Sequence, residues 1–298
     1  MSKTKNQHFV PRFYLKYFAD SKRRIWVFDK INRIIFNPSI ENIASKNFFY
    51  DNIELDSKYN EAQYLEKLYS KIESEFAPKY NDFINRVLSF ENYIITEKDK
   101  EAFSKYLISQ IDRTNEHREE ATQLYKHHRK LLIETGCSLD LLKQMGFEAE
   151  EMDSQTLHLE SIIAGIDNID MYAEMLCDHI WIVLKNDTTQ PFYTSDNPIV
   201  KQIHIENEDG FASPGIEIAF PLTPNHMLVL FEREYFQSFE TIENNVLSTT
   251  DIEFIGHYNT LQVNSSNRQI YSSLNNFELI EVLSKINPNS FDPNRLRV

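Results

Sequence analysis

The spacing of apolar residues changes near residue 179 of this 298-residue chain, and the change limits the folds that the chain can adopt. Before residue 179, apolar side chains recur at intervals of three and four, which places them on one face of a helix. After it, they form short runs such as HIWIVLKN and IEIAFPLTPNHMLVLFE, which are typical of strands. The pattern therefore predicts helices in the middle of the chain and strands in its C-terminal part. The clearest helical face, over 58–90, contains Tyr64, Leu65, Leu68, Ile72 and Phe76.

Further strands are predicted outside this C-terminal part. Residues 22–37, KRRIWVFDKINRIIFN, contain short alternating runs on either side of a DKIN turn and predict a β-hairpin. RQIYSS, which follows one or two expected helices, predicts a closing strand. We therefore expect a single α+β domain over residues 1–298, with a mixed or antiparallel sheet. The sheet would be built from 6–50 and 179–273, and the helices would form an insertion at about 58–176.

Prolines, glycines and capping residues set the expected limits of the helices. Pro78 should break or kink the helix over 58–90 and give two helices. TEKD, which begins at Thr96, has the pattern of a capping box and predicts the start of a helix that reaches Leu132. Gly136 is expected to end that helix. The remaining helices are expected over 138–146 and 154–176.

Composition argues against several classes of protein. Only six glycines are present and no GxGxxG or GxxxxGK[ST] sequence occurs, so a Gly-rich phosphate loop is not expected. A net charge of −14 argues against nonspecific coating of nucleic acid, although a local basic groove is compatible with it. Cys137 and Cys177 form no metal or redox motif, and without HExxH or CxxC the sequence indicates neither a metal site nor a particular cofactor. Because no run of about eighteen apolar residues occurs, we expect a cytoplasmic chain without a membrane span.

The first polar candidates lie in NQHFVPRFYL, residues 6–15. Histidine gains or loses a proton near neutral pH, and arginine presents a planar cation to phosphate or carboxylate. Pro11 keeps Val10 extended, and on an extended segment His8 and Arg12 point the same way. The two side chains would then face one ligand. Alternatively, His8 hydrogen-bonds the backbone and Arg12 anchors a carboxylate.

A second candidate segment is SQIDRTNEHREE, residues 109–120. On a continuous helix Arg113 and His117 would share a face, with Arg118 beside them. The RxxxH spacing is similar to the motif of a class of helical nucleases in which Arg and His act on RNA without a metal, although the spacing here is shorter. The neighbouring glutamates alternatively indicate a solvated face.

The third candidate segment is FYTSDNPIV, residues 192–200, in which polar groups follow an apolar strand. Asp196 can accept protons or hold a metal, and Ser195 and Asn197 can donate to or orient a ligand. Loops at strand ends commonly carry chemistry. The alternative is an Asx-turn, because Ser-Asp-Asn-Pro is also favourable turn chemistry.

Together these segments resemble an uncharacterised, mainly bacterial family of unknown function. Its members open with a QHxVPRxYLxxF-like segment and carry a TSDNP-like motif. The resemblance extends from residue 6 to about residue 273 and also includes FPLTP and NRQIYSS. It implies no established activity, and Asn115 departs from it because members often have a proline after RT. The positions that match the family pattern are Gln7, His8, Pro11, Arg12, Arg113, Arg118, Ser195, Asp196, Asn197 and Pro198.

We expect the three segments to meet in one pocket for a phosphate-bearing substrate. His8 would be the general acid or base, and Asp196 would orient it or hold a metal. Arg12 and Arg113 would hold the phosphate. This set suits a nuclease or nucleotide-directed hydrolase in a bacterial defence or toxin system. The remaining expected ligand contacts are Gln7, Arg118, Ser195 and Asn197.

Two alternatives to an enzyme fit the same residues. In the first, the chain is a binding module whose cleft recognises a nucleotide or another anionic ligand without turnover. In the second alternative the chain is an interaction protein, and its polar cluster only braces the N-terminus against the sheet, because buried ion pairs specify a fold rather than a reaction.

Overall fold

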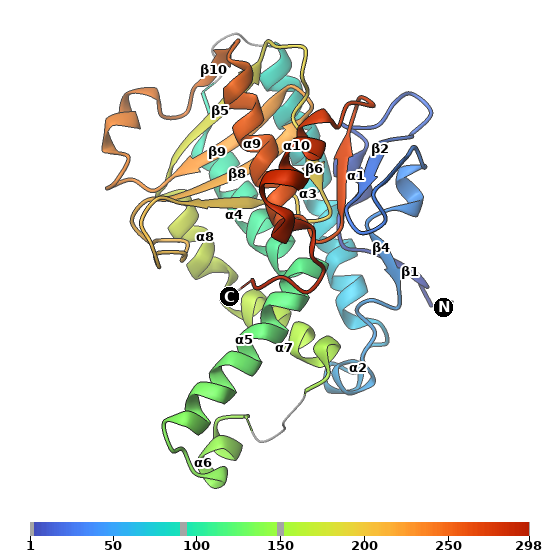
Figure 1. The fold of residues 1–298 in the computed structure, drawn as a ribbon, viewed down its shortest axis with the longest axis vertical. Coiled ribbons are helices and arrows are strands. Elements are labelled where there is room, and N and C mark those ends of the chain that lie inside the picture. Colours follow the sequence, from blue (N-terminus) through green and yellow to red (C-terminus); the bar gives the residue numbers. More distant parts are fainter. Residues whose placement is uncertain (1–2, 90–93, 148–151, 298) are drawn as a thin grey trace.

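The apolar runs after residue 179 form a five-stranded sheet in the computed structural model, which describes residues 3–89, 94–147 and 152–297. The strands are β5 (Ile180–Asn186), β7 (Val200–Ile203), β8 (Ile216–Thr223), β9 (His226–Phe231) and β10 (Val246–Thr249). Their order is β10-β5-β9-β8-β7 (Figure 1). β10 runs parallel to β5, and the other neighbours are antiparallel. The sheet is therefore mixed, within the α+β class that the sequence predicts.

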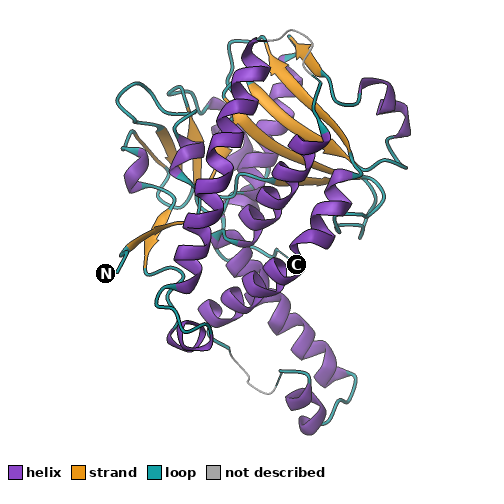
Figure 2. Cartoon of the chain, turned by 180° about the vertical axis from the view of Figure 1, so that it is seen from behind, coloured by secondary structure: helices purple, strands orange, loops and turns teal. Residues whose placement is uncertain are grey.

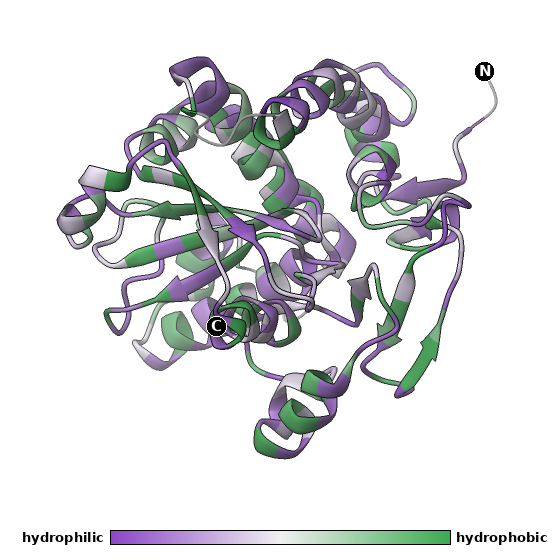
Figure 3. Ribbon diagram, turned by 90° about the horizontal axis from the view of Figure 1, so that it is seen from above, coloured by the Kyte–Doolittle hydropathy of each residue, from purple (hydrophilic) through white to green (hydrophobic). Residues whose placement is uncertain are grey.

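Helices cover both faces of this sheet, as Figures 2 and 3 show from behind and from above. Side chains such as Trp181 and Phe220 pack against α3 (Tyr64–Ser89), α4 (Glu97–Asp112) and α8 (Ile169–Cys177). On the opposite face, Ile182 and Val229 pack against α9 (Ile252–Ser265) and the 3₁₀ helix η2 (Gln237–Ile242). Burial on both faces explains why every residue of β8 and β9 is buried and most are apolar, rather than alternating with polar ones.

The predicted N-terminal hairpin joins a second, antiparallel sheet. Its strands are β2 (Trp26–Asp29), β3 (Ile34–Phe36), β6 (Thr194–Ser195) and β11 (Gln269–Ser272), in the order β3-β2-β11-β6. A separate two-stranded ribbon pairs β1 (Asn6–His8) with β4 (Ser45–Asn47), so that Gln7 lies opposite Lys46. The strands of 6–50 and 179–273 therefore form three sheets. The hairpin lies next to the TSDNP segment through β11.

The helix predicted over 58–90 is continuous, and the expected break at Pro78 is wrong. α3 runs through Pro78 from Tyr64 to Ser89. Pro78 removes the hydrogen bond that its N–H would donate to the carbonyl of Ser74. Both residues lie on the exposed side of α3, where water can satisfy that carbonyl.

The segment after Thr96 begins as predicted but is divided sooner. Thr96 caps α4, since Asp99 N donates to Thr96 Oγ1 at 3.2 Å and Thr96 N donates to Asp99 Oδ2 at 3.0 Å. α4 ends at Asp112, and Thr114 caps α5 (Asn115–Glu134). The expectation of one helix from Thr96 to Leu132 is therefore wrong, because the Thr114 hydroxyl accepts from His117 N at 3.2 Å and starts a new helix. Gly136 follows α5 with a φ of +82°, the left-handed conformation expected at a helix end.

The remaining helices follow the predicted positions with differences in detail. α6 (Leu139–Gln144) lies at the far end of an arm that α5 extends away from the sheets (Figure 1). The helix expected over 154–176 is divided at Asn168 into α7 (Ser154–Asp167) and α8. β10 occupies part of a stretch for which helices were expected. The other short elements are α1 (Arg12–Leu15), η1 (Ile40–Asn42), α2 (Ile53–Lys58), α10 (Glu278–Ile286) and η3 (Pro288–Phe291). Across the described ranges, each helix is too short or too polar to cross a lipid bilayer.

A tyrosine hydroxyl joins α1 to both sheets. Tyr14 is fully buried, and its ring stacks on Phe220 of β8 at 5.0 Å. Its hydroxyl donates to the carbonyl of Pro221 at 2.8 Å and lies 2.6 Å from Thr194 Oγ1 in β6. This contact holds the N-terminal segment in place beside the TSDNP strand.

We expect Tyr14→Phe to lower the free energy of unfolding by about 1–3 kcal/mol, because it leaves two buried polar partners without their hydrogen bond. Tyr17→Phe is the matched control, since the Tyr17 hydroxyl binds Asn81 at 2.8 Å in an exposed position. Urea denaturation of both variants measures the difference. Equal losses for the two variants would contradict the role assigned to the Tyr14 hydroxyl.

Candidate functional site

Arg113 brings the N-terminal ribbon, α3 and the end of α4 together. Its guanidinium Nη2 donates to the carbonyl of His8 at 2.6 Å, and Nη1 lies 2.8 Å from Glu73 Oε1. The guanidinium also lies over the ring of Tyr69, 4.2 Å from its centroid, and Nε donates to Tyr50 Oη at 3.3 Å. Arg113 is 2% exposed, so its charge is balanced from within the protein. Arg113 therefore contacts the backbone of His8, one of the residues expected to share its pocket.

Gln7 lies in the same ribbon as His8, but its side chain has a structural role. Its Nε2 donates to Asp51 Oδ1 at 2.6 Å, and its Oε1 accepts from Tyr50 N at 2.7 Å. Both ends of the amide are thus bound to residues that follow the ribbon. The prediction that Gln7 contacts a ligand has no support in this geometry.

His8 and Arg12 retain free hydrogen-bonding capacity. Burial, followed by the Arg12 cation, lowers the pKa of His8, so the ring is neutral at pH 7. His8 Nε2 is buried without a hydrogen-bond partner among the described residues. Arg12 is exposed at the start of α1, and we find no ion pair or hydrogen bond from its guanidinium within the described ranges. A proton acceptor and a free cation therefore lie close enough to influence each other.

Two glutamates complete this site, and the sequence reasoning missed them. Burial raises the pKa of Glu66 to about 7. The Arg113 cation lowers this pKa, and the Glu73 carboxylate raises it. Glu66 and Glu73 are two helical turns apart on α3, with Tyr69 between them, so all three share one face. The detectable signal was carboxylates on the apolar stripe, at positions where a core helix ordinarily places apolar residues. We call His8, Arg12, Glu66, Glu73 and Arg113 the ribbon site.

Asp196 does not join the ribbon site. Its Oδ1 accepts from Asn267 N at 2.9 Å, and its Oδ2 accepts from the N–H groups of Arg268 and Gln269 at 2.8 and 2.9 Å. Burial raises the pKa of Asp196 to about 6 against these hydrogen bonds. The carboxylate is thus used to hold the turn before β11. No contact supports the expectation that Asp196 orients His8, and the described residues include no group of three or more metal-ligating side chains.

Ser195 and Asn197 also hold backbone and helix ends. Ser195 Oγ bonds to Gln262 Oε1 and to the carbonyl of Asn197, both at 2.8 Å. Asn197 Nδ2 donates to the carbonyl of Ser265 at 3.0 Å. The turn alternative for this segment therefore describes its geometry better than the ligand-binding one.

Asn115 links the two regions. Lys46 Nζ donates to Asn115 Oδ1, and Asn115 Nδ2 donates to Asn267 Oδ1 at 2.8 Å. Asn267 in turn binds Asp196. Asn115, where the sequence departs from the family pattern, thus joins β4, the partner strand of β1, to the turn that binds Asp196. The three predicted segments are linked only indirectly and do not form one pocket.

Arg118 and His117 face away from the ribbon site. Arg118 donates to the carbonyl of Phe49 at 2.8 Å and to His158 Nδ1 at 3.1 Å, while its guanidinium stacks on the Phe49 ring. His117 Nε2 lies 2.8 Å from Ser161 Oγ on α7. Because the chain changes helices at Thr114, Arg113 and His117 do not share a helix face, and the similarity to RxxxH nucleases is not realised.

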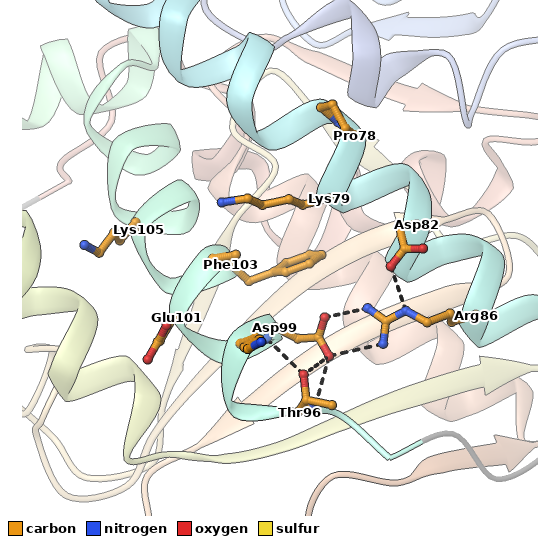
Figure 4. Close-up of a pocket in the computed structure, with 11 residues that line it drawn as sticks. Pro78, Lys79, Asp82, Arg86, Thr96, Asp99, Glu101, Phe103 and Lys105 are labelled. Atoms are coloured by element: carbon orange, nitrogen blue, oxygen red, sulfur yellow. Dashed lines mark hydrogen bonds and ion pairs between the residues drawn. The ribbon is translucent and has the colours of Figure 1, made fainter.

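A hollow of about 850 Å³ lies elsewhere, between α3 and the start of α4. Figure 4 shows that Arg86 bridges Asp82 and Asp99 at its wall. Pro78, Lys79, Phe103 and Lys105 line it further. None of the residues proposed from the sequence contributes to this hollow, and its arginine is already paired.

A comparison with known families is consistent with the uncharacterised family expected from the sequence. A family described as "Protein of unknown function (DUF4238)" matches residues 6–275. The chain belongs to this family. No curated protein and no solved structure matches the chain. The DUF4238 match covers the ribbon site and the Asp196 turn alike, so membership does not distinguish the two as functional sites.

We expect Asp196→Ala to lower the free energy of unfolding by about 2–4 kcal/mol, because three backbone N–H groups lose their acceptor. Asp170→Ala is the matched control, since Asp170 is 77% exposed and its ion pair with Lys105 is on the surface. The control should change stability by less than about 1 kcal/mol. A chemical denaturation curve for each variant measures both. A fully stable Asp196→Ala variant would show that the turn does not need the carboxylate.

Glu66 should make stability depend on pH in a specific direction. Its pKa is about 7 in the folded chain against an ordinary value of 4.5, so the folded state binds more protons between these values. This contribution to stability is therefore lost as the pH rises from 4.5 to 7. Glu66→Gln should be more stable than the unmodified chain by about 1–3 kcal/mol at pH 8, and the difference should shrink toward pH 5.

Unfolding free energies at pH 5 and pH 8 test this, with Glu75→Gln on the exposed side of α3 as the matched control. A Glu66→Gln variant that is less stable at pH 8 would mean that the charged carboxylate is stabilised by its neighbours.

Proposed function

We propose that the ribbon site binds a small phosphate-bearing ligand, such as a nucleotide, and hydrolyses it. Two groups carry the proposal. His8 Nε2 is buried and has no partner among the described residues, and the Arg12 guanidinium, likewise without an ion pair there, is near enough to lower the pKa of His8. Unpaired buried polar atoms are rare in folded proteins and commonly mark a functional site. A phosphate would accept hydrogen bonds from Arg12, whose planar fork suits its oxygens.

In this proposal the proton transfers divide between two groups with shifted pKa values. Neutral His8 accepts a proton from a water molecule as the water oxygen attacks phosphorus. The phosphorus–oxygen bond to the leaving group breaks, and protonated Glu66 supplies the proton to the leaving oxygen. A glutamic acid that titrates near 7 is suited to this role at neutral pH. Arg12 stabilises the developing negative charge.

A small ligand fits this chain better than a polymer. The net charge of −14 repels a long polyanion at a distance. Moreover, Arg113 is paired with Glu73, which leaves Arg12 as the available cation of the ribbon site. We therefore favour nucleotide hydrolysis over nuclease action. Depletion of nucleotides is a reaction that suits a bacterial defence or toxin system.

Binding without turnover is the second candidate. Glu73 already neutralises Arg113, and a single free cation is enough to recognise an anion but gives limited stabilisation of a transition state. For Gln7, Ser195, Asp196 and Asn197, by contrast, the hydrogen bonds favour the bracing role considered from the sequence.

The test is a panel of nucleoside mono-, di- and triphosphates assayed for phosphate release and for heat of binding. Arg12→Ala should weaken binding by about 10–100-fold, since it removes a charge-assisted contact. Lys22→Ala removes another exposed cation, from the turn before β2, and is the control. His8→Ala should reduce the rate by about 10²–10⁴-fold and leave binding within a few fold.

Each outcome decides between the candidates. Binding that depends on Arg12 without phosphate release supports the binding module. Release that persists in His8→Ala removes His8 from the mechanism. If no nucleotide binds, or if Arg12→Ala and Lys22→Ala behave alike, the proposed site is wrong.

A further inference from the structure

The C-terminal segment returns across the first turns of α5 after η3. Figure 1 shows that this segment ends beside α5, although the two are far apart in the sequence. Residues 292–297 lie outside the part of the chain that matches the family. Two of them, Arg295 and Arg297, reach the same carboxylate on α5.

That carboxylate is Glu116, which is 3% exposed. Arg295 Nη2 pairs with Glu116 Oε1, and Arg297 Nε lies 2.9 Å from the same oxygen. Arg295 Nη2 also donates to the carbonyl of Ser266 at 3.0 Å. Glu116 Oε2 accepts from Asn267 Nδ2 at 2.9 Å, which fixes the orientation of the carboxylate. The carboxylate is thus held ready for two guanidiniums.

Gln123 binds the backbone of the same segment at two points. Its Nε2 donates to the carbonyl of Arg295 at 2.9 Å, and its Oε1 accepts from Arg297 N at 2.8 Å. Glu116 and Gln123 are seven residues apart, so they share a face of α5. Leu296, between the two arginines, is 86% exposed. Alternate residues therefore face the helix while the middle one faces solvent, as in the recognition of an extended peptide.

Two guanidinium nitrogens of this segment lack a hydrogen-bond partner among the described residues. Arg295 Nη1 is buried and has no hydrogen-bond partner in the described ranges. Arg297 Nε is near Glu116 without the alignment of a hydrogen bond. Burial, followed by the Arg295 cation, lowers the pKa of the neighbouring Lys30 to about 7. These unsatisfied donors and the neighbouring Lys30 cation weaken the hold on the segment relative to a fully paired one.

We propose that Glu116 and Gln123 form a binding site for peptides with two arginines one residue apart, and that the chain's own Arg295–Arg297 segment occupies it as an exchangeable plug. The Glu116 carboxylate binds the two guanidiniums, and the Gln123 amide binds the extended backbone of the segment. Lysine is a poorer ligand, since it lacks the planar fork. This site is separate from the ribbon site, and its test does not depend on whether the chain hydrolyses nucleotides.

The test uses the full chain with Arg295→Ala and Arg297→Ala, which empties the site. The probe is a fluorescein-labelled peptide with the sequence of residues 292–297, DPNRLR, followed by fluorescence anisotropy. The double variant should bind the probe at least about tenfold more tightly than the unmodified chain, whose tethered segment competes at high effective concentration. Adding Glu116→Gln or Gln123→Ala should weaken binding at least about tenfold, as should replacing both probe arginines by alanine.

Failure of a folded double variant to bind the probe overturns the proposal, as does equal binding of the alanine probe. Circular dichroism establishes whether the variant is folded. If the double variant is not folded, the hydrogen-exchange rate of the Arg297 backbone amide in the unmodified chain tests whether the segment can be displaced. A millimolar excess of probe should accelerate this exchange by displacing the segment, and an unchanged rate shows that the segment is a fixed part of the fold.

Discussion

The burial of the Arg113 guanidinium is the constraint on which the N-terminal half of the molecule depends. Removing one partner from a buried ion pair typically costs about 3–5 kcal/mol, because the other charge is left uncompensated. Arg113 is paired with Glu73 and also bonds to the His8 carbonyl and to Tyr50. The ribbon, α3 and the end of α4 must therefore assemble together. That assembly partly buries His8 and Glu66, and so shifts their pKa values.

The same constraint explains why one short segment serves several parts of the molecule. Arg113 is the last residue before the break at Thr114, and it faces the ribbon. Beyond the break, Asn115 and Glu116 face the turn at Asn267, and Arg118 faces Phe49. A continuous helix would have carried these side chains around one axis. The capped break instead directs them to the ribbon site, the Asp196 turn and the peptide-like C-terminal segment.

Local sequence signals predicted local structure well. The Thr96 capping box, the hairpin over 22–37 and the turn at Gly136 depend on residues within a few positions of one another. Pro78 was misleading, since the effect of a proline depends on whether the freed carbonyl reaches water. The carboxylates of α3 were missed because a glutamate on an apolar stripe has no meaning until its partner is known, and Arg113 lies forty residues further along the chain.

The amino-acid sequence alone determined most of the helical and strand segments, the resemblance to the family and the polar residues worth considering, because these follow from periodicity and motif. Only the tertiary structure decided which polar groups are used up and which stay available. The sequence predicted a catalytic role for Asp196, but both of its carboxylate oxygens accept hydrogen bonds from backbone N–H groups. By contrast, His8 Nε2 has no partner within the described residues. Hydrogen-bond satisfaction and pKa depend on groups brought close by folding, such as His8 and Arg113, which lie 105 residues apart in the chain.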